Sequence, residues 1–119
     1  MEIYRAFKKF TGTLPANEVL YGYPYAMKNV YYIVTERMRV EMINPDTVDR
    51  FTGAYDIHGE RIFINDILEW AGPGNFIDSN IQLVKEENYK IFPLYINDTN
   101  WKKIGNIYGD IELLKNKKQ

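Results

Sequence analysis

Hydrophobic and polar residues alternate over several short stretches of this chain, with the period of two that is typical of β-strands. The clearest alternation lies in 37–43, where charged residues separate Met38, Val40 and Met42. We therefore expect this strand to have one face in solvent. Strands are predicted at 2–7, 31–34, 37–43, 61–64, 67–70, 81–85, 89–96 and 104–108.

Two segments depart from this alternation. Residues 19–25 are rich in tyrosine, but Gly22 and Pro24 would interrupt a regular strand, so an extended arm is predicted there. Near the C-terminus, Asp110 is suited to cap a single helical turn that runs through Leu114. The pattern thus predicts a mainly β protein with an N-terminal strand, a tyrosine-rich extended arm and a short C-terminal helical turn.

Turn signals are densest in 46–70. Gly53 follows a strand-like run that ends at Thr52, where a positive φ or a tight bend favours glycine. Asp56 and Gly59 then bound a four-residue stretch that fits a type I turn closed by a left-handed glycine. This order of elements predicts a hairpin.

The chain is expected to change direction at two further points. Residues 43–46 form a predicted turn that leads into the hairpin. After the hairpin, Asn65 and Asp66 interrupt a run of β-branched and aromatic residues, which resumes at Ile67. A hairpin, a bend and a new strand in close succession predict part of a small β-barrel.

These motif residues resemble the signature of a known family, the YopX family. The family's pattern is a Thr-Gly pair, then a hairpin, then G-x-x-I-x-x-x-D-I. The matching residues of this chain are Thr52, Gly53, Asp56, Gly59, Ile62, Asp66 and Ile67. A second segment, 104–108 with 112–114, is similar to the family's closing IGNIY…ELL and contributes Gly105 and Asn106. Residues 3–7 resemble its first strand more weakly. Together these matches cover roughly a third of the chain, in the family's order.

The resemblance implies a protein of phages and prophages of Gram-positive bacteria, mostly β, with an SH3-like barrel. It carries over no catalytic or ligand-binding residue. Asn65 departs from the pattern, because the family usually has glycine there. Among residues with a side chain, Asn and Asp tolerate positive φ best, so we predict a positive φ at Asn65. We also expect the Asp66 carboxylate to accept hydrogen bonds from backbone N–H groups of the same bend.

The domain organisation expected from these observations is a single YopX-like domain over 1–119. An N-terminal strand and the arm would occupy 1–45, the barrel core 46–114, and a frayed tail 115–119. A chain of 119 residues has the size of one domain.

Composition narrows the function. The chain has no cysteine, which excludes disulfides, Cys-based zinc sites and a Cys nucleophile. Its 15 basic and 16 acidic residues create no overall field that would attract nucleic acid or membrane. No apolar run resembles a signal peptide or reaches the length of a membrane span, so we expect the cytoplasm of the host bacterial cell.

Few residues could carry chemistry. Asp56, His58 and Glu60 alternate at the hairpin tip and could share a metal ion, although turns favour such polar residues for their own sake. His58 is the single histidine, which leaves little for proton relay. A carboxylate pair such as Glu60 with Asp66 is a weaker candidate. We therefore predict no enzyme, no cofactor and no metal.

A tyrosine cluster is the candidate binding site. It consists of Tyr21, Tyr23, Tyr25, Tyr31 and Tyr32, with Lys28, Arg37 and Arg39 nearby. Such tyrosines can stack on single-stranded nucleic acid, or they can pack on the barrel or on a neighbouring subunit. The favoured hypothesis is a non-enzymatic phage accessory protein that binds a protein partner or itself. The alternative is a single-stranded nucleic-acid-binding module that uses the arm.

Overall fold

A computed structural model describes residues 3–9, 18–74, 80–86 and 100–115 of the chain. In these ranges it contains eight β-strands and one short helix, so the prediction of a mainly β protein is confirmed. The chain separates into two compact units, Met1–Phe51 (unit one) and Thr52–Gln119 (unit two). Thr52 of the predicted motif therefore opens unit two, and the expected single domain over 1–119 stays a prediction.

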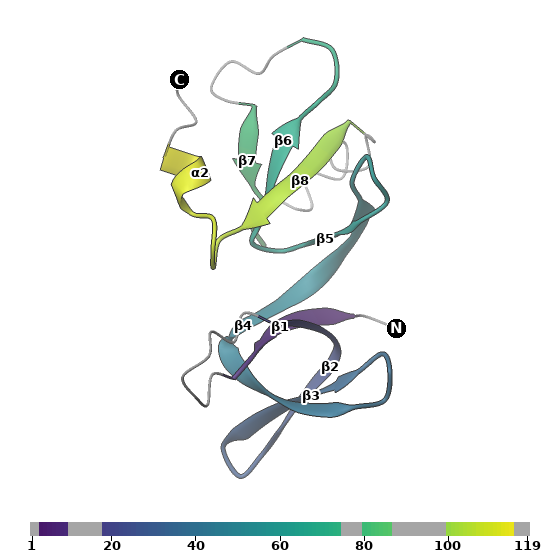
Figure 1. Cartoon of the computed structure of the whole chain (residues 1–119), viewed down its shortest axis with the longest axis vertical. Coiled ribbons are helices and arrows are strands. Elements are labelled where there is room, and N and C mark those ends of the chain that lie inside the picture. The colour runs from purple at the N-terminus through teal and green to yellow at the C-terminus, as the bar shows by residue number, and fades with distance from the viewer. Residues whose placement is uncertain (1–2, 10–17, 75–79, 87–99, 116–119) are drawn as a thin grey trace. The chain divides into compact units, whose positions relative to one another are not determined.

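Unit one is a sheet whose pairing closes on itself (Figure 1). Its strands are β1 (Tyr4–Lys8), β2 (Val19–Met27), β3 (Val30–Thr35) and β4 (Val40–Tyr55), the last of which continues into unit two. Each strand pairs antiparallel with the next, and β4 also pairs antiparallel with β1. The circuit leaves an enclosed face and an outer face.

The enclosed face forms the core of unit one. Ala6, Leu20, Ile33 and Ile43 come one from each strand and are buried, and Val48 packs against them. Burying a side chain of the size of leucine or isoleucine stabilises a fold by about 1.5–3 kcal/mol. Because successive side chains of a strand point to opposite faces, these residues also fix which neighbours point outward.

The prediction of an extended arm at 19–25 is wrong, because this segment is part of the regular strand β2. At Gly22 an added Cβ would lie 1.9 Å from the carbonyl oxygen of Val34, so only glycine lets β3 approach this closely. Pro24 lies beyond the residues of β2 that pair with β1, in a part of the strand where proline is tolerated. The residues that looked like strand breakers are compatible with this pairing.

The strand predicted at 37–43 begins later, at Val40. The preceding residues form a tight turn, in which Met38 has a φ of 63° and its N–H donates to the carbonyl oxygen of Thr35 (2.8 Å). The N–H of Thr35 in turn donates to the carbonyl oxygen of Arg39 (2.7 Å). The alternation of hydrophobic residues therefore runs across a turn.

The turn predicted at 43–46 is also wrong, because β4 passes through it without ending. The extra residues of β4 are accommodated where the register with β1 shifts between Arg5 and Phe7. Thr47 stabilises the backbone where the register shifts. Its hydroxyl donates to the carbonyl oxygen of Asn44 (2.7 Å) and accepts from the N–H of Phe7 (2.8 Å). A side chain thus replaces part of the backbone ladder.

Unit two contains two small sheet regions and the helix. The end of β4 pairs with β5 (Arg61–Phe63). A three-stranded sheet has the order β7 (Ile81–Leu83), β6 (Asp66–Trp70) and β8 (Trp101–Asn106), and α2 (Glu112–Lys115) follows. The buried core of unit two consists of Ala54, Ile62, Ile64, Leu68, Val84 and Trp101.

Most other predicted strands are found, with shifted ends. The strands predicted at 61–64 and 67–70 are β5 and β6. Those at 2–7, 31–34, 81–85 and 104–108 correspond to β1, β3, β7 and β8. The strand predicted at 89–96 lies outside the described residues, as do residues 116–119 of the tail. The SH3-like form of the barrel stays a prediction.

Candidate binding face and motif residues

The outer face of β2, β3 and β4 in unit one carries three rows of apolar and aromatic side chains. Directly paired residues of neighbouring strands point to the same side of a sheet, so the register defines these rows. The rows are Tyr23–Val34–Val40, Tyr25–Tyr32–Met42 and Met27–Val30. These eight residues are called the outer face below.

Several members of the outer face are well exposed. Met27 is 59% exposed and Val40 55%, while Tyr23 and Tyr25 are each 37% exposed and Met42 36%. An antiparallel sheet with one packed face ordinarily shows polar residues on the other. Here all eight outward positions are apolar or aromatic. Contiguous exposed apolar patches larger than a few hundred Å² are typical of interaction surfaces.

The rows are held in place by local structure. The rings of Tyr25 and Tyr32 stack with centroids 5.4 Å apart and planes at 24°. Beyond Met27, the chain reverses through Lys28 and Asn29, both with positive φ (50° and 66°). Two such residues are characteristic of the type I′ turn, whose twist matches that of the flanking strands. The outer face therefore lies on a regular hairpin.

The hairpin motif of unit two begins at Thr52. Its hydroxyl donates to the carbonyl oxygen of Ile62 (2.6 Å) and accepts from the N–H of Ala54 (3.2 Å). Gly53 has a φ of 90°, so of the two conformations that favour glycine there, a positive φ or a tight bend, the structure has the first. The Thr52 side chain thus links the end of β4 to β5.

The Asp56 carboxylate organises the hairpin tip. One oxygen accepts from the N–H groups of His58 (2.8 Å) and Glu60 (2.9 Å), and the other from the N–H of Lys103 (3.0 Å). Burial raises the pKa of Asp56, but these N–H donors lower it more, so the pKa lies below its ordinary value. The N–H of Gly59 donates to the Asp56 carbonyl (3.0 Å) and Gly59 has a φ of 80°, which confirms the predicted turn.

The bend after β5 has the predicted conformation. Asn65 has a φ of 71°, as expected. The buried carboxylate of Asp66 accepts from the N–H of Phe63 (2.7 Å) and lies 3.3 Å from Nζ of Lys103. Ile67, next in the chain, is fully buried. Asp66 thus fixes the backbone of the bend, which confirms its expected use.

The closing motif forms a second tight loop. The side-chain oxygen of Asn106 accepts from the N–H groups of Tyr108 (3.0 Å) and Gly109 (3.3 Å). The Asp110 carboxylate accepts from the N–H of Asn106 (3.1 Å), so it closes this loop instead of capping α2 as predicted. A Cβ at Gly105 would come within 2.6 Å of that carboxylate. Each of these polar groups has a structural partner.

The comparisons with known proteins agree with these motifs. A family model described as YopX protein matches residues 3–115. The chain belongs to the YopX family. No curated protein matches the chain, and no solved structure matches it. The predicted resemblance to YopX is thus confirmed over nearly the whole chain.

In this YopX family member, the five predicted tyrosines do not form one cluster. Tyr23, Tyr25 and Tyr32 belong to the outer face, and Tyr21 lies on the same side of β2, half-buried opposite β1. Tyr31 pairs with Ala26 and lies on the opposite side of the hairpin. Four of the five tyrosines therefore lie on one side of the sheet and Tyr31 lies on the other, while their role in binding stays a prediction.

Sequence reasoning missed the aliphatic half of the outer face. The alternation in 37–43 predicts one face in solvent without saying which one. In the structure Val40 and Met42 are exposed, whereas the Glu41 side chain is only 17% exposed. Glu41 lies 3.2 Å from the Arg39 guanidinium and 3.8 Å from the Lys8 ammonium. The available signal was Ile43, one residue later, which interrupts the alternation in the sequence and is buried in the structure.

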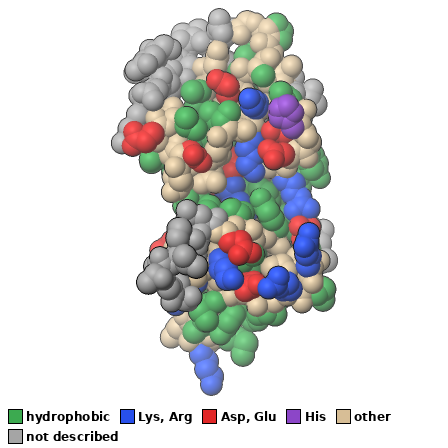
Figure 2. All heavy atoms as spheres, viewed as in Figure 1, with side chains coloured by type: hydrophobic (Ala, Val, Ile, Leu, Met, Phe, Trp, Pro, Cys, Tyr) green, Lys and Arg blue, Asp and Glu red, His purple; other side chains and the backbone are tan. Residues whose placement is uncertain are grey.

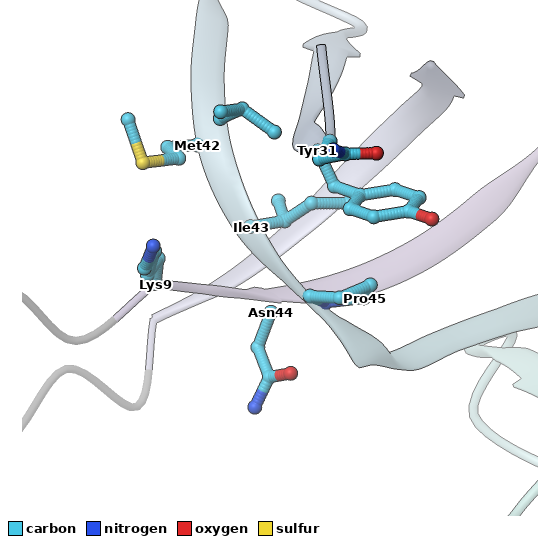
Figure 3. A pocket seen from close by; sticks show the side chains of 8 residues that line it. Lys9, Tyr31, Met42, Ile43, Asn44 and Pro45 are labelled. Carbon is cyan, nitrogen blue, oxygen red and sulfur yellow. The ribbon is translucent and has the colours of Figure 1, made fainter. Parts of the chain in front are cut away.

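A hollow adjoins one edge of the outer face (Figure 3). It has a volume of about 450 Å³ and is lined by Lys9, Asn29, Val30, Tyr31, Met42, Ile43, Asn44 and Pro45. In Figure 3, Ile43 lies beside Tyr31, with Lys9 across from them and the Asn44 side chain pointing away. The hollow thus lies at the edge of the sheet, where Val30 and Met42 of the outer face meet Tyr31 and Ile43, which belong to the other side.

The residues considered for metal binding or catalysis either contact the backbone or another side chain, or are exposed. Among the described residues, no three His, Cys, Asp or Glu side chains are placed to hold a metal ion. Asp56 is engaged by backbone N–H groups, while His58 and Glu60 are exposed. Asp66, the other member of the proposed carboxylate pair, has Lys103 as its ionic neighbour. In the described ranges, no helix is long and apolar enough to cross a membrane.

Proposed function

We propose that this YopX family member is a non-enzymatic protein that works by binding a protein surface through its outer face. The observation that carries the proposal is the alignment of eight apolar and aromatic side chains in three rows across three paired strands. Figure 2 shows hydrophobic side chains gathered at the β2–β3 hairpin on the side it views. Ordered strands present such a surface without the entropic cost of folding a loop on binding.

The chemistry of the described residues supports binding over catalysis. A catalytic acid or base needs a pKa near the working pH and access to a substrate. The pKa of Asp56 is instead lowered by three backbone donors, and Asp66 is buried beside Lys103. His58 stands exposed at a turn. These groups stabilise unit two.

The proposal also includes the fold of unit one and the origin of the protein. The barrel core is expected at 46–114, whereas the closed pairing of β1 to β4 supports a small barrel in unit one instead. An SH3-like form is what the family resemblance implies. Membership of the YopX family supports an accessory role in a phage or prophage, exercised in the cytoplasm of the host cell. No step of this role requires a cofactor.

The alternative, a single-stranded nucleic-acid-binding module, receives less support. Bases stack on aromatic rings where nearby cations contact the phosphates. Lys28 lies at one end of the outer face and Arg39 at the other, and Arg39 pairs with Glu41. A fluorescent oligothymidylate should therefore show no tight binding by anisotropy. Binding that weakens steeply with salt would contradict the protein-binding proposal.

Site-specific cross-linking tests the proposed function. A photoreactive benzoylphenylalanine would replace Tyr25 of the outer face or, as the control, Tyr55 of unit two, which is 51% exposed. Irradiation in the bacterium that carries the gene should give a defined cross-linked protein from position 25 and none of that kind from position 55. The product is identified by mass spectrometry. Absence of any product specific to position 25 would contradict the proposal.

A further inference from the structure

We infer that the hollow beside the outer face binds the C-terminal residue of a partner protein. An aromatic or branched apolar side chain would fill the hollow, and the carboxylate of the chain end would lie on the Lys9 ammonium. This inference rests on the proposed function and adds the chemistry by which the partner is recognised. The volume of the hollow, about 450 Å³, lies in the range of ligand-binding sites.

The hollow exists because β3 and β4 separate. β3 stays paired with β2 as far as Val30, whereas its pairing with β4 ends at the pair of Tyr32 and Met42. From Ile43, β4 continues along β1 instead. The walls of the hollow are therefore paired strands, which a ligand does not have to order when it binds.

The walls are mainly apolar and aromatic. Tyr31 is 42% exposed and Met42 36% exposed, and the Tyr31 ring lies beside Ile43 (Figure 3). Val30 and Pro45 complete the apolar lining. Covering apolar surface with another apolar group removes both from water, which favours binding. An aromatic or branched apolar side chain therefore suits the hollow.

Lys9 supplies the charge of the hollow. Of the described residues that line it, Lys9 alone is charged. The preceding residue, Lys8, has the carboxylates of Glu18 (3.9 Å) and Glu41 (3.8 Å) near its ammonium. Within the described ranges no carboxylate pairs with the Lys9 ammonium, while the Lys9 backbone N–H donates to the carbonyl oxygen of Met42 (2.9 Å). A cation across from an apolar wall is complementary to an apolar group that bears a carboxylate.

The end of a protein chain has this combination. A C-terminal residue carries its side chain and its carboxylate on one Cα, whereas an internal Asp or Glu brings a carboxylate without the apolar group. Val30 and Met42 belong to the outer face as well as to the hollow, so the residues before the chain end would lie against the outer face. The hollow and the outer face thus form one continuous surface for the end of a partner chain.

Titration of the full chain, followed through its methyl signals by NMR, tests the inference. The probes are acetyl-Ala-Leu-Phe with a free C-terminal carboxylate and the same tripeptide with a C-terminal amide. We expect the free acid to bind with a dissociation constant of about 0.1–1 mM and to shift the signals of Val30, Met42 and Ile43. It should bind about threefold to fivefold more tightly than the amide, which is the effect of an exposed ion pair.

Three variants locate the two parts of the ligand, and circular dichroism establishes that each is folded. Lys9→Met should abolish the difference between the free acid and the amide. Lys28→Met is the matched control and should retain the difference, because Lys28 is exposed in the adjacent β2–β3 turn and does not line the hollow. Tyr31→Ser should weaken both peptides at least about threefold, because it removes part of the apolar wall.

Equal binding of the free acid and the amide by the wild type would overturn the inference, as would a preference for the acid that persists in Lys9→Met. Binding of 3-phenylpropionate as tight as that of the peptide would overturn the assignment to a chain end, since the preceding residues would contribute nothing. A cross-linked protein from position 25 without peptide binding in the hollow overturns this inference alone. No cross-linked protein contradicts the proposed function and, with it, the partner's chain end as the ligand.

Discussion

Nζ of Lys103 lies 3.3 Å from Oδ2 of Asp66, and the same carboxylate oxygen accepts the N–H of Phe63 at 2.7 Å. The Asp66 side chain is completely buried, whereas that of Lys103 retains 17% exposure. Lys103 also donates to the carbonyl oxygen of Arg61 (3.1 Å). One carboxylate of the family motif therefore connects the bend after β5 to β8.

Asp66→Asn should destabilise the protein by about 3 kcal/mol. The substitution leaves the Lys103 ammonium without its counter-charge and replaces one carboxylate oxygen by an NH2 group, so that a single neutral oxygen is left to face both Lys103 and the Phe63 N–H. The free energy of unfolding is measured by urea denaturation. Asp46→Asn is the control, because Asp46 is exposed, and it should change stability by less than about 0.5 kcal/mol. Equal effects of the two substitutions would show that the buried pair adds nothing.

The local structure of unit two followed from its sequence because the signals were local. Asp56 with Gly59 and the Asn65–Asp66 bend depend on side chains that bond their own backbone within a few residues. Such turn chemistry does not need the rest of the fold. The turn at Asp56, the positive φ of Asn65 and the hydrogen bond of the Asp66 carboxylate to the bend were therefore predictable, whereas the bond from the Lys103 N–H to Asp56 was not, because it joins residues far apart in the sequence.

Unit one was less predictable because its structure depends on distant strands. Gly22 resembles a strand breaker until Val34 is placed against it. The alternation through Val40 and Met42 identifies a strand, but it does not say which face is buried. That choice was made by Ile33 and Ile43 in the closed circuit. The outer face could not be assigned from one strand alone.

Substitutions at Asn65 should separate backbone conformation from side-chain contact. Its φ of 71° disfavours a branched Cβ, so Asn65→Val should cost about 1–2 kcal/mol. Asn65→Gly should be neutral or slightly stabilising, even though it loses the 3.3 Å contact from Nδ2 to the Tyr108 hydroxyl. Thermal unfolding of the three proteins checks this. If Gly and Val variants were equally destabilised, the side-chain contact would be the cause instead.

Asp56 should make stability depend on acid pH. Because its pKa is lower in the folded protein than in the unfolded chain, its contribution is fully present above about pH 4. The contribution is lost as the pH falls through the folded pKa. Asp56→Asn should therefore flatten the decline of the unfolding free energy below about pH 4 relative to Asp46→Asn. Parallel pH profiles for the two variants would contradict this role for Asp56.

His58→Asn should leave stability within about 0.5 kcal/mol of the wild type. His58 is exposed, and it reaches Asp56 through its backbone N–H, which the substitution retains. The test pairs chemical denaturation with metal analysis of the purified protein. A metal that is retained by the wild type and lost by the variant would restore the metal-binding hypothesis for the hairpin tip.

Replacing Gly22 with alanine should strongly destabilise unit one. An added Cβ would lie 1.9 Å from the carbonyl oxygen of Val34 and 2.9 Å from Cα of Thr35, both backbone atoms that cannot rotate away. Gly22→Ala must therefore separate β2 from β3, and we expect a loss of about 3 kcal/mol or more. Gly109→Ala is the control, because nothing lies within 4 Å of its added Cβ.

The same substitution tests whether the outer face depends on this close approach. Tyr23 and Val34 form the β2–β3 pair next to Gly22, so separating these strands should also displace Tyr23 from Val34. Amide hydrogen exchange should show faster exchange across β2 and β3 in Gly22→Ala and unchanged exchange in β6 and β8. Equal amide protection of β2 and β3 in Gly22→Ala and in Gly109→Ala would contradict this expectation. It would mean that β3 moves away from β2 without cost, so that the close approach at Gly22 does not hold the rows in register.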